Sequence, residues 1–422
     1  MNRRFEMARH AYTTVPFYRE LAEKEPQILM WIESGQWEKL PLVKKNQIVL
    51  QQDKFISDDY LGELVMGRLN RTHTSGSTGT YLDVYWSKTD MSAALLPLWM
   101  ERFRQAGVRT NDKVCLFNTT LQEDYQINGN KMLISKQKLN REKLIRIYQK
   151  MEEFNPSWLL VHPGIAQMIL QMVKEEQLPI LPNLKYIELT GEMVTAGLKQ
   201  SLEKVFSSQV RSHYGTMEVS TIGYEYQETY QLFNQSTYVE IIDNNGQLVN
   251  DGEYGEVYVT SLHNHAMPFV RYGIGDVGRI VMRDITKTKL ELKHARKNDL
   301  LMMPDGSSKL PDVLLGPVEQ INQCMERMIY QFQVFQQTRD SLLINVVLDG
   351  EEYVFCDYYS QILKYQSTQT QKFGGIMLAI SLVAILFAVE EWKEDFKWKF
   401  QYSKEVQVNQ ETGKSGWFFS QV

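Results

Sequence analysis

The sequence predicts an α/β protein with a large N-terminal domain and a small α+β C-terminal domain. Between residues 88 and 206, short apolar runs alternate with longer stretches of helical spacing, which is typical of mixed or parallel sheets flanked by helices. After about residue 235 the pattern changes to short strands and turns, which predicts a β-rich subdomain. The chain becomes polar at 296–299, so we expect the two domains to span 1–295 and 296–422.

The expected elements follow from the positions of proline and from the spacing of apolar residues. Residues 1–60 predict helices that break at Pro16, Pro26 and Pro41, because proline lacks the backbone donor that continues a helix. Residues 81–86 alternate in polarity and predict a strand. Beyond them we expect helices at 88–107, 141–153, 164–174 and 195–206, and strands at 114–117, 158–161, 186–189, 238–242 and 255–260.

Composition and charge bound the class of protein. With 422 residues, of which 43% are hydrophobic and 23% charged, the chain has the composition of a folded protein of two or more domains. The net charge of −5 gives no indication of a nucleic-acid partner, and we expect none. The cysteines Cys115, Cys324 and Cys356 lack metal-ligand spacing, and residues 1–6 lack an apolar signal core. We therefore expect a cytoplasmic protein without a zinc site.

Residues 373–389 form a stretch of 17 uncharged residues in the small domain. A membrane-spanning helix needs about 20 apolar residues, and about 17 is the lower limit. A helix that is apolar on all sides has to be buried in some medium. Two interpretations stay open: burial in protein, inside the small domain or at the interface of a homodimer, and contact with a membrane.

Residues 72–80 read Thr-His-Thr-Ser-Gly-Ser-Thr-Gly-Thr and lead into the predicted strand at 81–86. Glycine lets the backbone approach a ligand closely, and hydroxyl and backbone N–H groups donate to phosphate oxygens. Taken alone, these nine residues favour an ordinary surface turn. They also lack the G-x-x-x-x-G-K-[ST] pattern of a Walker A loop.

Later segments add candidate site residues, and we expect these segments to form turns. Residues 188–192, Glu-Leu-Thr-Gly-Glu, follow a predicted strand, and ligands bind at the carboxyl ends of strands in α/β sheets. Residues 213–218, His-Tyr-Gly-Thr-Met-Glu, join an aromatic ring to a carboxylate, whose oxygens suit Mg²⁺. Residues 269–276 end in an aspartate that can accept from two hydroxyls. Two further segments, 295–299 and 411–417, carry Arg296 and Lys414.

In this order and spacing, the segments resemble the nucleotide-contacting motifs of the adenylate-forming enzymes. This superfamily includes acyl-CoA synthetases, peptide-synthetase adenylation domains and luciferase, and the sequence resembles the phenylacetate–CoA ligase branch most closely. The resemblance covers nearly the whole chain. It implies that ATP and Mg²⁺ convert a small-molecule carboxylic acid to an acyl-adenylate. After rotation of a mobile C-terminal domain about residues 296–300, the acyl group would pass to a thiol, with coenzyme A expected as the acceptor.

Several alternatives stay open at this point. The acceptor can also be the thiol of an acyl carrier protein, or an amine. A membrane-associated protein and a non-catalytic nucleotide-binding protein are the other two classes. An aryl or arylacetic acid is expected as substrate by analogy with the branch alone.

The resemblance implies a role for each candidate residue. The glycine-rich segment would wrap the β- and γ-phosphates, and the 190–192 turn would lie at the adenine edge. Tyr214 would stack on adenine, Glu218 would bind Mg²⁺, and Asp276 would accept from the ribose hydroxyls. The nucleotide-binding set is Thr74, Ser75, Gly76, Ser77, Thr78, Gly79, Thr190, Gly191, Glu192, Tyr214, Gly215, Thr216, Asp276 and Arg296.

The catalytic pair implied by the resemblance is Glu218 and Lys414, of which Lys414 would bridge the substrate carboxylate and the α-phosphate. The sequence departs from the family pattern at three positions. Met217 stands where the family keeps serine or threonine near the α-phosphate, and Thr216 is the neighbouring hydroxyl. Ala295 replaces glycine and Asn298 replaces aspartate at the expected hinge, where a few residues absorb the change in backbone angles.

Overall fold

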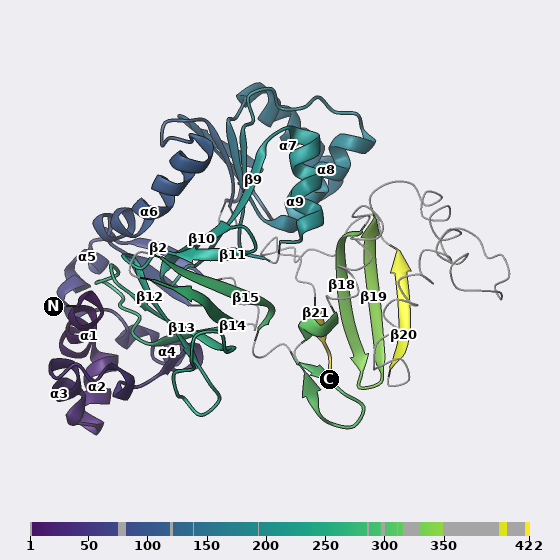
Figure 1. The fold of residues 1–422 in the computed structure, drawn as a ribbon. Coiled ribbons are helices and arrows are strands. Elements are labelled where there is room, and N and C mark those ends of the chain that lie inside the picture. Colours follow the sequence, from purple (N-terminus) through teal and green to yellow (C-terminus); the bar gives the residue numbers. More distant parts are fainter. Residues whose placement is uncertain are drawn as a thin grey trace. The chain divides into compact units, whose positions relative to one another are not determined.

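The computed structural model describes residues 2–74, 82–118, 121–137, 139–192, 194–284, 287–296, 300–309, 311–314, 329–348, 396–402 and 418–422. The chain forms two compact units, one from Met1–Thr110 with Arg211–Lys297 and one from Asn111–Val210 with Asn298–Val422. Each unit contains helices and a sheet (Figure 1), so the predicted α/β class is confirmed. The predicted domain boundary between residues 295 and 296 stays a prediction.

Three helices begin the first unit: α1 (Arg3–Thr14), α2 (Pro16–Lys24) and α3 (Gln27–Glu33). The side chain of Asn2 accepts from the backbone N–H of Arg4 and caps α1. Pro16 is the first residue of α2, a position whose backbone N–H makes no hydrogen bond within the helix. The break predicted at Pro16 is therefore confirmed. Short elements follow: η1 (Trp37–Lys39), β1 (Val43–Lys44), α4 (Lys45–Val49), η2 (Gln52–Lys54), η3 (Asp58–Tyr60) and α5 (Leu61–Val65).

A two-stranded hairpin and a long helix come next. Strands β2 (Asn70–His73) and β3 (Asp83–Trp86) pair antiparallel, which confirms the strand predicted at 81–86. Helix α6 (Lys88–Ala106) begins after Ser87, whose hydroxyl accepts from the backbone of the first turn. It ends at Gly107, which adopts the left-handed conformation that closes many helices, as predicted.

The main sheet of the first unit is antiparallel and has the order β12-β13-β14-β15-β11-β10-β9. A short parallel pairing adds β1 to β14, with Val43 opposite Tyr272. Strand β10 was not predicted, because residues 221–224 are all buried and the alternation of a half-buried strand is absent. The strands are β9 (Gln209–Thr216), β10 (Ser220–Tyr226), β11 (Thr229–Leu232), β12 (Thr237–Ile242), β13 (Gly255–Ser261), β14 (Tyr272–Arg283) and β15 (Thr288–Arg296).

A buried ion pair anchors the beginning of β14. The Arg271 side chain is 2% exposed, and its guanidinium donates to both carboxylate oxygens of Glu240, at 3.0 and 3.3 Å. A further guanidinium nitrogen donates to the backbone carbonyls of Glu38 and Leu40. Burial raises the pKa of Glu240, and the adjacent guanidinium opposes that rise. The pair therefore joins the N-terminal segment to the sheet in a place without water.

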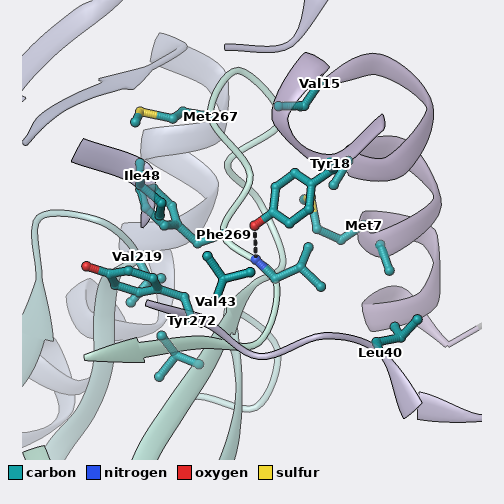
Figure 2. Close-up of a cluster of buried hydrophobic side chains, with 14 of the residues drawn as sticks. Met7, Val15, Tyr18, Leu40, Val43, Ile48, Val219, Met267, Phe269 and Tyr272 are labelled. Atoms are coloured by element: carbon teal, nitrogen blue, oxygen red, sulfur yellow. Dashed lines mark hydrogen bonds between the residues drawn. The ribbon is translucent and has the colours of Figure 1, made fainter. Parts of the chain in front are cut away.

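An apolar cluster packs around this anchor, and Figure 2 shows its centre. Tyr18 from α2, Val43 from β1 and Tyr272 from β14 meet there, together with Phe269. The Tyr18 hydroxyl accepts from the backbone N–H of Val270 at 3.0 Å, the bond drawn in Figure 2. Segments more than 200 residues apart in the chain thus share one core.

The second unit contains a parallel sheet of the order β8-β7-β4-β6, with β5 antiparallel at its edge. Three amphipathic helices, α7 (Arg141–Phe154), α8 (Pro163–Glu175) and α9 (Ala196–Phe206), contribute to one apolar core with these strands. These helices and three of the strands were predicted, whereas the β5–β6 hairpin was not. The strands are β4 (Val114–Asn118), β5 (Tyr125–Asn128), β6 (Lys131–Ser135), β7 (Trp158–Val161) and β8 (Tyr186–Leu189).

The C-terminal part adds a sheet of the order β20-β19-β18-β21. Its strands are β18 (Ile329–Thr338), β19 (Ser341–Leu348), β20 (Lys397–Tyr402) and β21 (Phe418–Ser420), preceded by β16 (Leu301–Met302), β17 (Ser308–Lys309) and η4 (Pro311–Leu314). The apolar stretch 373–389 lies outside the described residues, so both interpretations of it stay predictions. Within the described ranges, every helix is too short or too polar to cross a membrane.

Replacing Arg271 by methionine should strongly destabilise the first unit. The change keeps most of the side-chain volume but leaves the Glu240 carboxylate buried without its counter-ion. Breaking a buried pair in this way costs about 3–5 kcal/mol of unfolding free energy, measured by urea denaturation. The matched control is Arg279→Met, whose partner Glu291 lies at 3.0 Å in a partly exposed pair and should cost at most about 1 kcal/mol. Equal losses in the two variants would contradict the anchoring role.

Candidate functional site

The residues on either side of the glycine-rich segment, Thr74 and Leu82, are hydrogen-bonded to each other in the first unit. The backbone N–H of Thr74 donates to the carbonyl of Leu82 at 3.0 Å, and the N–H of Leu82 donates to the Thr74 hydroxyl at 3.0 Å. The ammonium of Lys45, at the start of α4, donates to the same hydroxyl at 3.0 Å. Thr74 is buried, and Ser75, Gly76, Ser77, Thr78 and Gly79 lie outside the described residues. The two ends of the segment are therefore held together beside a positive charge.

The β9–β10 hairpin carries the next group of candidate residues. Gly215 faces the partner strand so closely that a Cβ atom there would lie 2.2 Å from the carbonyl oxygen of Ser220. The hydroxyl of Thr216, the last residue of β9, accepts from the backbone N–H of Val219. In the connecting loop, the Met217 carbonyl accepts from the indole of Trp86 at 3.2 Å. The loop is thus tied to β3, the strand that follows the glycine-rich segment.

Glu218 lies in this hairpin loop, and its side chain points inward. The carboxylate is nearly buried, with 7% of the residue exposed, and Oε1 accepts from the hydroxyl of Tyr272 at 3.0 Å. Among the residues that the structure describes, this is the one hydrogen bond made by the Glu218 carboxylate. A buried carboxylate with one oxygen engaged can still offer its other oxygen to a cation.

Tyr214 and Asp276 meet directly. The Tyr214 hydroxyl donates to Oδ2 of Asp276 at 2.7 Å, although the two residues are 62 positions apart. The Tyr214 ring lies 5.5 Å from the ring of Tyr230, and the Tyr230 hydroxyl lies 3.0 Å from Oγ of Ser212. Burial raises the pKa of Tyr230 to about 12, so its hydroxyl stays protonated at neutral pH.

Both residues lie in strands, so the expectation of turns was wrong for Tyr214 and Asp276. Tyr214 belongs to β9, and Asp276 belongs to β14. The pairing of β13 with β14 shifts between Glu256 and Tyr258, and Gly275 has a positive φ of 83°. A β-bulge of this kind redirects side chains and is frequent beside functional sites. Gly275 adopts the positive φ at this bulge without steric cost, and the bulge presents Asp276.

A second cluster lies at the carboxyl ends of the parallel strands in the second unit. Lys136 follows β6, His162 follows β7, and Gly191 and Glu192 follow β8. Nζ of Lys136 lies 2.6 Å from Nε2 of His162, and the opposite ring nitrogen lies 3.7 Å from the Glu192 carboxylate. Gly191 has a positive φ of 83°, and a Cβ atom there would lie 2.7 Å from the His162 ring. The Glu192 carboxylate also accepts from the backbone N–H of Gly164 in the first turn of α8.

The structure thus brings together some of the predicted residues and leaves others untested. Tyr214, Asp276 and Glu218 belong to one sheet and its hairpin, and Asp276 is the backbone partner of Arg296 across β14 and β15. Thr190, Gly191 and Glu192 belong to the second unit. Lys414 lies outside the described residues.

Sequence reasoning missed five residues of these contact networks. Lys45, His162 and Tyr272 contact predicted site residues, whereas Trp86 contacts Met217 and Lys136 contacts His162. A local signal existed for His162, because it follows the strand predicted at 158–161. Tyr272 lies inside the motif segment 269–276, but its partner Glu218 is distant in the chain. The others had no local signal.

Comparison with known proteins finds a family match and several relatives. Residues 70–266 match the family described as AMP-binding enzyme. The phenylacetate-coenzyme A ligase of Pseudomonas putida is 24% identical over 402 residues, which cover 89% of this chain and 87% of that protein. The D-alanine–D-alanyl carrier protein ligase of Bacillus licheniformis is 26% identical over 204 residues, covering 44% of this chain and 40% of that enzyme.

Solved structures share the fold. The crystal structure of 2-hydroxyisobutyryl-CoA ligase in the postadenylation state, in complex with 2-HIB-AMP, aligns with a TM-score of 0.71 at 16% identity. The alignment covers 99% of this chain and 88% of that one. The same ligase with 2-HIB-AMP and CoA in the thioesterification state aligns with a TM-score of 0.59 at 17% identity over the same shares of both chains.

Replacing Gly215 by alanine should destabilise the β9–β10 hairpin. The added methyl group would meet the Ser220 carbonyl oxygen, and overpacking against a backbone atom costs about 1–3 kcal/mol. Thermal unfolding should show a lower Tm. The control is Gly62→Ala in α5, where a Cβ atom meets nothing within 4 Å and φ is not positive, so its Tm should be unchanged or higher. A Gly215→Ala protein as stable as the wild type would refute the close packing.

Proposed function

We propose that the chain is an AMP-forming acid–thiol ligase of the adenylate-forming superfamily, because residues 70–266 match the AMP-binding enzyme family and a phenylacetate-coenzyme A ligase matches over most of the chain. It joins ATP to a small-molecule carboxylic acid to form an acyl-adenylate, and it then transfers the acyl group to the thiol of coenzyme A. The observation that carries the proposal is the hydrogen bond between Tyr214 and Asp276, the two residues that we propose for stacking on adenine and for accepting from the ribose hydroxyls.

The first unit offers the contacts that hold the nucleoside. One carboxylate provides about four acceptor positions, so Asp276 can keep the Tyr214 hydroxyl and also accept from ribose hydroxyls. The Tyr214 ring offers a face for stacking. Thr74 and Lys45 hold the ends of the segment that would wrap the β- and γ-phosphates.

Mg²⁺ fits the residues of this site. Glu218 offers one buried carboxylate, and within the described ranges no group of three or more His, Cys, Asp or Glu residues is arranged to hold a metal. Mg²⁺ usually keeps several waters and binds through one or two carboxylates together with substrate phosphates. Bound there, it would neutralise charge on the phosphate oxygens.

In the first half-reaction, a carboxylate oxygen of the acid attacks the α-phosphorus of ATP, and pyrophosphate leaves. The protein contributes chiefly positioning and charge stabilisation. Lys414 supplies a positive charge between the substrate carboxylate and the α-phosphate, for which a flexible ammonium is suited. In the second half-reaction, the sulfur of the thiol attacks the acyl carbon, AMP leaves, and the thiol proton is released to solvent.

A carrier-protein thiol is the second candidate acceptor, and the match to the D-alanine–D-alanyl carrier protein ligase favours it. An aryl or arylacetic acid is the first choice of substrate, because the match to a phenylacetate-coenzyme A ligase covers most of the chain. Pyrophosphate release with ATP, Mg²⁺ and a panel of aryl, aliphatic and hydroxy acids tests the function. Coenzyme A or a carrier protein as acceptor then separates the two candidates.

Lys414→Ala should abolish acyl-adenylate formation while ATP still binds, because the lysine acts on charge that develops in the transition state. ATP–pyrophosphate exchange measures the chemical step, and calorimetry measures ATP binding. Lys287→Ala, in the exposed turn between β14 and β15, should exchange as fast as the wild type. Unchanged exchange in Lys414→Ala would remove this residue from the reaction.

Glu218→Gln should raise the Mg²⁺ concentration for half-maximal pyrophosphate exchange by about tenfold or more, because an amide oxygen is a weaker ligand than a carboxylate. The matched control is Glu256→Gln, since Glu256 is also buried and also accepts from a tyrosine hydroxyl, at 3.4 Å from Tyr258. Its Mg²⁺ titration should match that of the wild type. A Glu218→Gln titration that overlays the wild type would exclude Glu218 as the metal ligand.

A further inference from the structure

Tyr272 makes a contact that the proposed reaction does not yet use. Its hydroxyl donates to Oε1 of Glu218 at 3.0 Å, between the first residue of β14 and the β9–β10 loop. Tyr272 is 1% exposed, so its hydroxyl needs a partner inside the protein. That partner is Glu218, the carboxylate that the proposed function assigns to Mg²⁺.

The Tyr272 ring is held on several sides. Figure 2 shows it within the apolar cluster, together with Phe269, Val43 and Val219. The Phe269 ring lies 5.0 Å away at an angle of 59°, and Val43 is the backbone partner of Tyr272 across β1 and β14. A ring packed in this way cannot easily turn, so its hydroxyl is a fixed point against which a carboxylate can be oriented.

The backbone at Tyr272 is equally constrained. The preceding residue, Arg271, has a positive φ of 46° and is tied through its side chain to Glu240. The N–H of Arg271 donates to the Thr260 hydroxyl at 2.9 Å, and its carbonyl accepts from Val43 at 2.9 Å. The backbone that carries the Tyr272 side chain is therefore fixed by groups that lie outside the hairpin loop.

We propose that Tyr272 is a positioning residue for the magnesium ligand Glu218: it holds one carboxylate oxygen so that the other is directed at the metal. This inference rests on the proposed function. A carboxylate in a loop would otherwise have to become ordered when the metal binds, at a cost in affinity. Groups that hydrogen-bond to metal ligands commonly affect metal affinity about 10–100-fold when they are removed.

The test is the Tyr272→Phe variant of the full chain, which keeps the ring and removes only the hydroxyl. Mn²⁺ serves as the probe, with α,β-methylene-ATP as a nucleotide that cannot release pyrophosphate. Electron paramagnetic resonance measures the Mn²⁺ that remains in solution, so the readout is metal binding and not turnover. Calorimetry in the presence of EDTA measures nucleotide binding without metal.

A matched control comes from the same cluster. Tyr18→Phe also removes a buried hydroxyl, which accepts from Val270 at 3.0 Å only two residues before Tyr272, and both rings are drawn in Figure 2. Tyr18 does not contact Glu218 through this hydroxyl. The control therefore reproduces the loss of one buried hydrogen bond and spares the carboxylate.

We expect Mn²⁺ to bind Tyr272→Phe about tenfold more weakly than the wild type. Tyr18→Phe should bind Mn²⁺ like the wild type, and both variants should bind the nucleotide in EDTA within about twofold of the wild type. Wild-type Mn²⁺ affinity in Tyr272→Phe, or an equal loss in Tyr18→Phe, would overturn the inference.

The Glu218→Gln variant distinguishes failure of the positioning role of Tyr272 from failure of the proposed function. Weak Mn²⁺ binding in Glu218→Gln together with wild-type binding in Tyr272→Phe would overturn the positioning role alone. Wild-type Mn²⁺ binding in Glu218→Gln would overturn both the metal ligand and the residue that positions it.

Discussion

The buried pair of Arg271 and Glu240 is the constraint on which the candidate site depends. Two charges removed from water are tolerated only when each meets its partner and further hydrogen bonds satisfy the remaining donors. Arg271 meets this condition through the Glu240 carboxylate and the carbonyls of Glu38 and Leu40. Because the next residue is Tyr272 and the bulge follows at once, the pair fixes where β14 begins and so where Asp276 is presented.

The hairpin of β9 and β10 contributes the opposite half of the same site. Tyr214 meets Asp276, and Glu218 meets Tyr272, so two hydrogen bonds connect the hairpin to β14. Each bond joins a tyrosine hydroxyl to a carboxylate, which leaves acceptor capacity on both carboxylates. The tyrosine hydroxyls therefore hold one oxygen of each carboxylate.

The cluster of Lys136, His162 and Glu192 in the second unit depends on parallel strands and not on an antiparallel sheet. Lys136, His162 and Glu192 come from three successive strand ends, and parallel strands bring their carboxyl ends to one edge of the sheet. Gly191 permits the close approach, because a side chain there would collide with the His162 ring. The turn after β8 is therefore shaped by polar neighbours that belong to the same sheet edge.

The sequence by itself determined the α/β class, most of the helices and the identity of the motif residues, since these depend on local patterns of apolar residues, glycine and proline. It did not predict β10, whose residues 221–224 are buried on both faces. It also did not predict the bulge at Gly275, because the sequence of this segment indicated a turn. Only the tertiary structure decided that Tyr214 meets Asp276 and that Tyr272 meets Glu218. These pairs lie 62 and 54 positions apart, and local sequence carries no information about contacts that the packing of a whole sheet creates.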